Sequence, residues 1–369
     1  MTTTLETVMG TSGPGLELAA PRLTREQFLV LHRAMVRTRK LDERGMKLQR
    51  QGRIGFYVPS FGEEAAQIGS AAALDAADWI SPSYRQPGTA LWRGVKPVEM
   101  LDNCFGNAGD AAKGRQMPVH YTFRSRNFIS IGSPIGTQIA HAAGVAMAMK
   151  IRGDGHVCLT YLGDGATSSN DFHTGLNFGG VFKAPCVFIC INNQYAISLC
   201  VTGQTTSVSI ADKAVAYGMP GRRVDGNDVL AVYSATKDAV DAARRGEGPT
   251  LLELFSFRMG PHSSSDDPSR YRPKAMEEEW AAKDPIQRFE KWLIANGHAD
   301  AAALAAVHAA AEEEMSEAAK ESETKPAPAK DSLFDDVFAE RPAGLLKQRT
   351  ALLAEGDAHA ADMNAAFPL

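Results

Sequence analysis

The sequence predicts an α/β fold in which a parallel sheet is covered by helices on both faces. Residues 157–162, 185–191 and 250–257 are short apolar segments with the near-continuous hydrophobicity of buried strands. Segments with helical spacing separate them, and parallel strands need such crossover connections. The chain has 369 residues, enough for one large domain with appendages or for two small domains.

The remaining elements follow in chain order. A helix begins after Thr24, which can form a capping box with Gln27, and runs to about residue 51. A small-residue helix at 62–77 and a turn at 83–85 come next. Beyond the first strand we expect helices at 169–182, 207–217 and 228–245, a short strand at 222–224, a loop at 260–272, helices at 274–295 and 301–321, and a terminal amphipathic element at 332–355.

These elements divide the chain into three predicted parts. Residues 1–23 are expected to be a flexible N-terminal arm, and residues 24–295 the α/β domain. Residues 296–369 are a helical C-terminal extension, with an extended Pro/Ala linker near 325–330.

Composition restricts the classes of partner. The net charge of −4 gives no electrostatic reason to expect nucleic acid. The longest apolar run, at 135–149, is interrupted by polar residues, so no membrane span is expected. The five cysteines are an odd number without CxxC spacing, and Cys186 and Cys190 fall on one face of a strand. Together with the lack of a signal or presequence pattern, this predicts a cytoplasmic protein.

The strongest motif is Gly163-Asp164-Gly165 after one strand and Asn192-Asn193 after the next, with 26 residues between them. The carboxyl ends of neighbouring parallel strands share one edge of a sheet, so Asp164 and Asn193 should converge there. Their oxygens suit Mg²⁺ completed by a diphosphate, and the glycines allow close approach of phosphate. The motif therefore predicts a diphosphate site.

Each half of this motif has a plainer interpretation, since Asp164-Gly165 could be only a turn and Asn192-Asn193 only a strand end. A second Gly-Asp-Gly, at residues 153–155, precedes a strand and is interpreted as a turn. The pair of motifs, in the order strand, turn, helix, strand, is what favours the diphosphate.

This arrangement resembles the thiamine-diphosphate motif. Residues 163–198, together with 61–74, 83–94 and 114–120, resemble the α subunit of the decarboxylase component of 2-oxo acid dehydrogenase complexes. The similarity extends from about residue 25 to 350 and implies a thiamine-diphosphate-binding fold, with 24–295 as the diphosphate-side domain. The loop at 260–272 (GPHSSSDDPSRYR) resembles the branched-chain type of that family.

The resemblance also implies roles for single residues. It gives Mg²⁺ the side chains of Asp164 and Asn193 and the backbone carbonyl of Tyr195. It makes His262 and Arg258 the catalytic residues. The other cofactor-binding positions that it implies are Gly165 and Ala166 through their backbone, Tyr84 and Arg85 at the diphosphate, Ser133, Ile135 beneath the cofactor, Ile197, and His262 itself.

Two further groups of residues have competing explanations. Pro134, Thr137 and Gln138 match a monovalent-cation (K⁺) site, although Thr and Gln are common where a helix begins. Phe56 and Tyr57 are candidates for the substrate pocket, and core packing explains them equally well.

The sequence predicts no second α/β domain that could supply the glutamate that the resemblance requires to activate thiamine diphosphate. The resemblance implies that a β subunit supplies it, in a tetramer of two α and two β chains, with a lipoyl acyltransferase core as a further partner and a branched-chain 2-oxo acid as substrate. Two alternatives remain: a pyruvate or acetoin dehydrogenase α subunit, and a non-catalytic assembly subunit that has kept the fold.

Overall fold

The computed structural model describes residues 4–10 and 15–355. Its centre is a seven-stranded sheet in the order β2-β1-β8-β9-β5-β4-β3, and every neighbouring pair is parallel. The predicted α/β class is therefore confirmed. The strands are β1 (Leu5–Thr7), β2 (Leu16–Glu17), β3 (Trp79–Ser81), β4 (Cys158–Gly163), β5 (Cys186–Asn192), β8 (Gly221–Asp225) and β9 (Thr250–Phe255).

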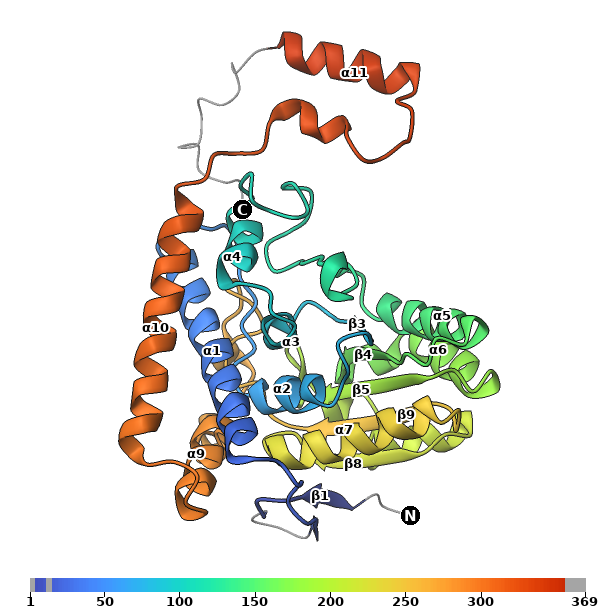
Figure 1. The fold of residues 1–369 in the computed structure, drawn as a ribbon, viewed down its shortest axis with the longest axis vertical. Helices are drawn as coiled ribbons and strands as arrows, with labels where there is room; N and C mark the ends of the chain where they lie inside the picture. The colour runs from blue at the N-terminus through green and yellow to red at the C-terminus, as the bar shows by residue number, and fades with distance from the viewer. Residues whose placement is uncertain (1–3, 11–14, 356–369) are drawn as a thin grey trace.

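Helices cover both faces of this sheet (Figure 1). The α-helices are α1 (Arg25–Arg50), α2 (Glu64–Ala72), α3 (Pro87–Trp92), α4 (Pro97–Phe105), α5 (Thr137–Arg152), α6 (Asn170–Val181), α7 (Val229–Arg244), α8 (Lys274–Ala281), α9 (Pro285–Ala295), α10 (Ala301–Glu323) and α11 (Ala343–Ala354). A small hairpin of β6 (Tyr195–Ala196) and β7 (Leu199–Cys200) follows β5. The 3₁₀ turns are Arg124–Arg126, Asp164–Ser168, Val201–Gly203, Ala211–Tyr217, Pro268–Arg270 and Lys330–Phe334.

Strand β5 divides the core into two layers, because successive side chains of a strand point to opposite faces. Val187 and Ile189 pack in the layer that contains α1, α2 and α7. Cys186, Phe188 and Cys190 pack in the layer of α5 and α6. Both cysteines are fully buried, as expected, and none of the chain's five cysteines, all of them described, forms a disulfide.

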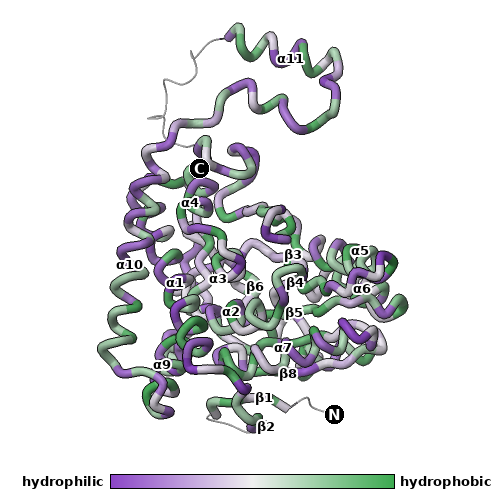
Figure 2. The backbone as a smooth tube through the Cα atoms, in the orientation of Figure 1, coloured by the Kyte–Doolittle hydropathy of each residue, from purple (hydrophilic) through white to green (hydrophobic). Residues whose placement is uncertain are grey.

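Helices α1 and α10 pack side by side along one edge of the molecule, and α11 lies at the end remote from β1 (Figure 1). Both polar and apolar stretches occur along α1 and α10 (Figure 2), as expected of helices with one face on a core. Within residues 4–10 and 15–355, no helix combines the length and the apolar composition that crossing a bilayer requires.

Several expected elements differ in extent. The helix predicted at 274–295 is two helices, α8 and α9, because Pro285 has no N–H to donate and instead starts α9 with Asp284 as its N-cap. Residues 207–217 form only the 3₁₀ turn Ala211–Tyr217, and the helix expected at 62–77 is confined to Glu64–Ala72. Strand β3 was not predicted from the sequence; it has only three residues, Trp79–Ser81.

The N-terminal arm was expected to lack structure, yet two of its segments join the sheet edge as β1 and β2. Asp228 explains the attachment. Its Oδ1 caps the first turn of α7, while its Oδ2 accepts hydrogen bonds from the Thr7 hydroxyl at 3.0 Å and from the backbone N–H groups of Val8 and Met9 at 2.7 and 2.6 Å. One buried carboxylate thus caps a helix and holds the arm.

Replacing Asp228 tests this attachment. Asp228→Ala should lower the free energy of unfolding by about 2–4 kcal/mol, because it removes a helix cap and leaves buried N–H donors without an acceptor. Amide exchange should also quicken at Val8 and Met9. Asp300→Ala, which removes the N-cap of α10 with its single bond to Ala303, is the control and should cost about 1 kcal/mol without affecting the arm. If urea unfolding showed the same loss of stability for Asp228→Ala and Asp300→Ala, Asp228 would not both cap α7 and hold the arm.

Candidate active site

A cavity of about 640 Å³ opens at the carboxyl ends of β4 and β5. The structure brings most of the sequence-predicted site residues to its wall. They are Tyr84, Arg85, Ser133, Ile135, Gln138, Asp164, Gly165, Ala166, Asn193, Tyr195, Ile197, Arg258 and His262. Of the remaining candidates, Phe56 is part of the wall, whereas Pro134, Thr137 and Tyr57 are not.

Asp164 and Asn193 converge as the motif predicts. Strands β4 and β5 pair in register, with Gly163 beside Ile191, so both side chains emerge at the same edge. Asp164 is 2% exposed and its Oδ2 accepts a hydrogen bond from Nε2 of Gln204 at 2.7 Å. Burial raises the pKa of Asp164, opposed by hydrogen bonds to the carboxylate.

The backbone between these residues is closely packed. A Cβ atom on Gly165 would lie only 2.7 Å from Cβ of Ala196, so the β6–β7 hairpin can lie over the motif only where a glycine stands. Within the hairpin loops, Gln194 and Ile197 have positive φ angles of 76° and 54°. Such strained conformations are held by surrounding structure and are frequent at functional sites.

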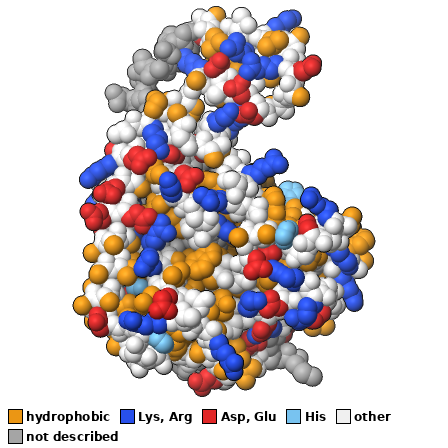
Figure 3. Space-filling model, viewed as in Figure 1, with side chains coloured by type: hydrophobic (Ala, Val, Ile, Leu, Met, Phe, Trp, Pro, Cys, Tyr) orange, Lys and Arg blue, Asp and Glu red, His pale blue; other side chains and the backbone are white. Residues whose placement is uncertain are grey.

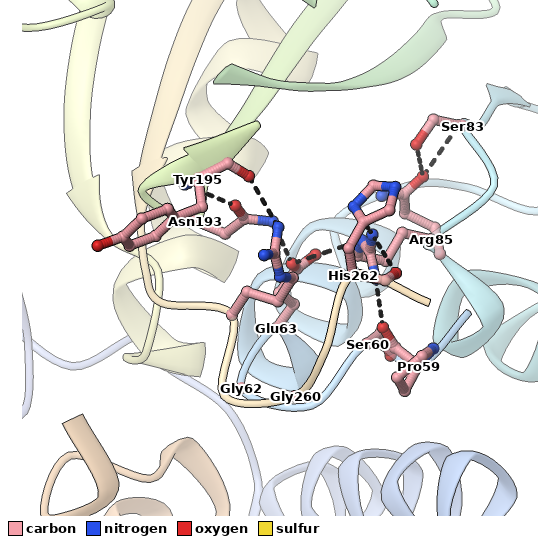
Figure 4. Close-up of polar contacts among 12 residues, drawn as sticks. Pro59, Ser60, Gly62, Glu63, Ser83, Arg85, Asn193, Tyr195, Gly260 and His262 are labelled. Atoms are coloured by element: carbon pink, nitrogen blue, oxygen red, sulfur yellow. Dashed lines mark hydrogen bonds and ion pairs between the residues drawn. The ribbon is translucent and has the colours of Figure 1, made fainter. Parts of the chain in front are cut away.

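Arg85 is buried and binds the loop that carries His262 (Figure 4). Its Nη2 donates to the backbone carbonyl of His262 at 2.9 Å and lies 3.0 Å from Nδ1 of the same residue. Since guanidinium is only a donor, Nδ1 must carry the lone pair and Nε2 the proton. The guanidinium also lies 5.5 Å from the centre of the Tyr84 ring.

His262 is held in its neutral form. Burial lowers the pKa of His262 most, and the nearby charges of Arg85 and Arg258 lower it further, to about 3, against the opposing effect of Asp266. The backbone N–H of His262 donates to Oδ2 of Asp266 at 2.7 Å, which fixes the loop. The site therefore presents a neutral imidazole that can donate from Nε2.

Arg258 carries a charge without a carboxylate partner. It is 1% exposed, and its donors meet only neutral oxygens: the carbonyls of Tyr195 and Ile197 at 2.9 and 2.7 Å and the hydroxyl of Tyr271 at 2.8 Å. Among the described residues its Nε has no partner. Burial lowers the pKa of Arg258 as well. A buried, uncompensated cation on a cavity wall favours an anionic ligand.

Glu63 is a wall residue that the sequence analysis missed. It is 1% exposed, and its Oε1 accepts a hydrogen bond from Nδ2 of Asn193 at 2.6 Å and lies 4.0 Å from Nε of Arg85 (Figure 4). Burial raises the pKa of Glu63 to about 7, against the opposing effects of Arg85 and Asn193. Two adjacent acidic residues, Glu63 and Glu64, at the start of an Ala-rich helix were the available signal.

Ser133, Ile135 and His120 also line the cavity. The Ser133 hydroxyl lies 2.8 Å from Nε2 of His120, which stacks on Tyr84 with ring centres 6.3 Å apart. Ile135 is 51% exposed, an unusual position for a large aliphatic side chain in a cavity wall. Such exposure fits a surface that a ligand covers.

The candidates for the cation site and Tyr57 make hydrogen bonds of their own. Thr137 donates to the carbonyl of Pro134 at 3.2 Å, and the amide of Gln138 donates to the carbonyl of Tyr161 at 2.9 Å. Tyr57 is fully buried and donates to Asp42 at 2.9 Å, so core packing accounts for it.

The fold and the cavity define an α/β protein in which buried carboxylates and buried arginines meet in one cavity at the carboxyl edge of the sheet. Residues 32–331 match the family model described as "Dehydrogenase E1 component". The chain belongs to this dehydrogenase E1 family, which confirms the resemblance found in the sequence. Membership of the family implies thiamine diphosphate as the cofactor.

Three relatives illustrate the similarity. The 3-methyl-2-oxobutanoate dehydrogenase subunit alpha of Mycobacterium tuberculosis is 43% identical over 90% of this chain and 88% of the relative. The mitochondrial 2-oxoisovalerate dehydrogenase subunit alpha of Homo sapiens is 41% identical over 90% of this chain and 75% of the relative. The pyruvate dehydrogenase E1 component subunit alpha of Bacillus cereus is 42% identical over 90% of this chain and 87% of the relative.

The neutral state of His262 can be measured. The imidazole should remain unprotonated at about pH 5 in carbon-13 NMR of histidine-labelled protein, because its pKa lies near 3. Arg85→Met removes a neighbouring cation and should raise that pKa toward the ordinary value of about 6.5. His156→Gln identifies the resonance of a histidine outside the cavity and should leave the pKa of His262 unchanged. An ordinary pKa in the unmodified protein would contradict the burial and charge argument.

Proposed function

We propose that this chain is the α subunit of a branched-chain 2-oxo acid dehydrogenase. With thiamine diphosphate it would catalyse the oxidative decarboxylation of acids such as 3-methyl-2-oxobutanoate and acylate the lipoyl group of an acyltransferase core. One observation carries the proposal: Asp164, Asn193, Arg85, Arg258 and His262 converge on one cavity in a chain of the E1 family.

The branched-chain substrate is supported by the names of the human and mycobacterial relatives and by the loop at 260–272. A pyruvate dehydrogenase α subunit is the second candidate, since the Bacillus cereus relative is equally similar and bears that name. A non-catalytic subunit is disfavoured because the residues that the proposed chemistry takes from this chain, Asp164, Asn193, Arg85 and His262, all line the cavity.

The donors at the motif fit Mg²⁺. The proposed ligands are Asp164, Asn193 and the carbonyl of Tyr195, all hard oxygens. Glu63 accepts from Nδ2 of Asn193, and a carboxylate can bind only the NH₂ side of an amide, so Oδ1 is the atom left for the metal. Asp164 and the Tyr195 carbonyl accept bonds from Gln204 and Arg258, which a metal would replace.

The same cavity fits a diphosphate. We propose that the Arg85 guanidinium and the Tyr84 hydroxyl bind its oxygens, while Gly165 and Ala166 contribute backbone N–H groups. Ile135 would support the cofactor from below, with Ser133 and Ile197 at its edges. The uncompensated charge of Arg258 offsets part of the negative charge of diphosphate and substrate carboxylate.

Thiamine diphosphate, when bound, supplies the nucleophilic carbon and the electron sink for loss of CO₂. The protein's contribution is to position and protonate. His262, neutral with its proton on Nε2, can donate a hydrogen bond to the 2-oxo oxygen while Arg85 holds Nδ1. Arg258 would orient the substrate carboxylate. Phe56 offers an apolar wall for a branched side chain.

A K⁺ ion is proposed where the loop that contains Pro134 meets the start of helix α5, at Thr137 and Gln138. The Thr137 hydroxyl already faces the Pro134 carbonyl at 3.2 Å. We also propose the domain division from the sequence, with the diphosphate-side domain at 24–295 and the helical extension at 296–369; helices α10 and α11, which follow the last strand, support it. A reducing compartment, the cytoplasm, is proposed on the five unpaired thiols.

The α subunits named among the relatives imply a β subunit as partner. We propose a tetramer of two α and two β chains in which β supplies the glutamate that this chain lacks. Support comes from large exposed apolar side chains around α5 and α6, where a partner would cover them. They are Ile151, Phe178, Val181, Phe182, Val208 and Val215, and a second group at 333–353 comprises Leu333, Val337, Phe338, Leu346 and Leu353.

Decarboxylation by the co-expressed α and β chains tests the function. With thiamine diphosphate, Mg²⁺ and an artificial electron acceptor, turnover of 3-methyl-2-oxobutanoate should exceed that of pyruvate. Asp164→Ala should reduce it by more than about 100-fold, because a metal ligand is lost. Preference for pyruvate would overturn the substrate class. A well-formed complex without cofactor-dependent activity would overturn the enzyme.

Removing Glu63 tests the orientation of Asn193. Glu63→Leu should weaken Mg²⁺ binding by about 10–100-fold, because the Asn193 amide is then free to turn its nitrogen toward the metal. Glu63→Gln keeps an acceptor oxygen and should recover most of the affinity. Binding is measured with Mn²⁺ by electron paramagnetic resonance, independently of turnover. Unchanged affinity in the leucine variant would contradict the positioning role.

A further inference from the structure

Three side chains from three helices meet outside the cavity. His32 on α1, Glu290 on α9 and His308 on α10 place their ligand atoms within 4.8 Å of one another. Nε2 of His32 and Nε2 of His308 lie 2.8 and 2.7 Å from the same oxygen, Oε1 of Glu290. No other three His, Cys, Asp or Glu residues converge in this way in the part of the chain that the structure describes.

We propose that His32, Glu290 and His308 form a binding site for a divalent transition-metal ion, with Zn²⁺ as the best match. Two imidazole nitrogens and one carboxylate oxygen form a ligand set that Zn²⁺ takes in four-coordinate sites. The side chain of His32 is fully buried, whereas those of Glu290 and His308 are 21% and 36% exposed. The open side supplies an entry path and room for water as the fourth ligand.

The hydrogen bonds of the cluster suit a metal. Both histidines donate from Nε2 to the same carboxylate oxygen of Glu290, so the three proposed ligand atoms already lie together. An imidazole binds a metal through Nε2 only when that nitrogen carries a lone pair, so a metal would replace both donated protons.

The strength of binding follows from the environment of His32. Its Nδ1 is buried and has no partner among the described residues. A metal on Nε2 would leave the Nδ1 proton without the acceptor that metal-bound histidines usually have. We therefore expect micromolar affinity, well below that of a structural zinc finger.

A metal here would join the C-terminal extension to the α/β domain. The remaining polar links between α1 and α10 include the ion pairs Arg37–Glu314 and Arg44–Glu312, with distances of 2.6 and 2.8 Å. Acidic and basic side chains are interspersed on the surface along the edge formed by α1 and α10 (Figure 3). Partly exposed ion pairs of this kind contribute little to stability, so a coordinated ion would be the stronger connection. None of its three ligands lines the cavity.

The test is zinc binding by the complete αβ complex, saturated with thiamine diphosphate and Mg²⁺ so that the cavity is filled. After chelation and dialysis against Zn²⁺, elemental analysis should find one more zinc per α chain in the unmodified complex than in the His308→Gln or Glu290→Gln variants. The His156→Gln control should retain that zinc. Glu290→Gln keeps an acceptor for both histidines, which guards against misfolding as an explanation.

Two further measurements distinguish a metal-binding site from a cluster that only forms hydrogen bonds. Co²⁺ in place of Zn²⁺ should give visible d–d absorption that both site variants lose. Zn²⁺ should slow amide exchange in α10 of the unmodified complex and leave exchange in the Glu290→Gln variant unchanged. Equal zinc content in all four proteins, or none above the level of the site variants, would overturn the proposal.

Discussion

The parallel pairing of β4 with β5 is the constraint on which the site depends. Because Gly163 lies beside Ile191, Asp164 and Asn193 leave the sheet at one edge, and the turn after β4 can approach the hairpin after β5. A slip of one residue would exchange the two faces of β5 and place Phe188 and Cys190 against the wrong helices. Packing in the two core layers therefore fixes the register of β5, and that register places the residues of the cavity.

Within the cavity, burial determines how the charges behave. Arg85, Arg258, Asp164 and Glu63 are all nearly inaccessible to solvent. Their mutual interactions are stronger there than at the surface, because little water screens them. Arg85 is compensated in part by Glu63, while Arg258 binds neutral oxygens only. Burial and the same positive surroundings lower the pKa of His262 and keep it neutral, so the site combines attraction for anions with a hydrogen-bond donor that is uncharged.

Two parts of the surface indicate that the chain works in an assembly. Apolar side chains remain exposed around α5 and α6, and a second group lies near α11, which extends away from the domain (Figure 1). Helix α10 connects that extension to the domain, and it rests on α1 through ion pairs and the His32–Glu290–His308 cluster. A β subunit that covers both groups would contact the domain and the extension together.

The sequence by itself determined the α/β class, the diphosphate motif and the family, because these depend on local periodicity and on residue types at fixed spacing. Asp164, Asn193, Arg85 and His262 could be named in advance because motifs carry them. Glu63 could not, since its partner Asn193 is 130 positions away in the chain and only folding joins them. The N-terminal strands, held by Asp228, and the cluster of His32 with Glu290 and His308 likewise depend on long-range packing. Tertiary structure alone decided those contacts, because each one joins segments whose local sequences contain no signal of the other.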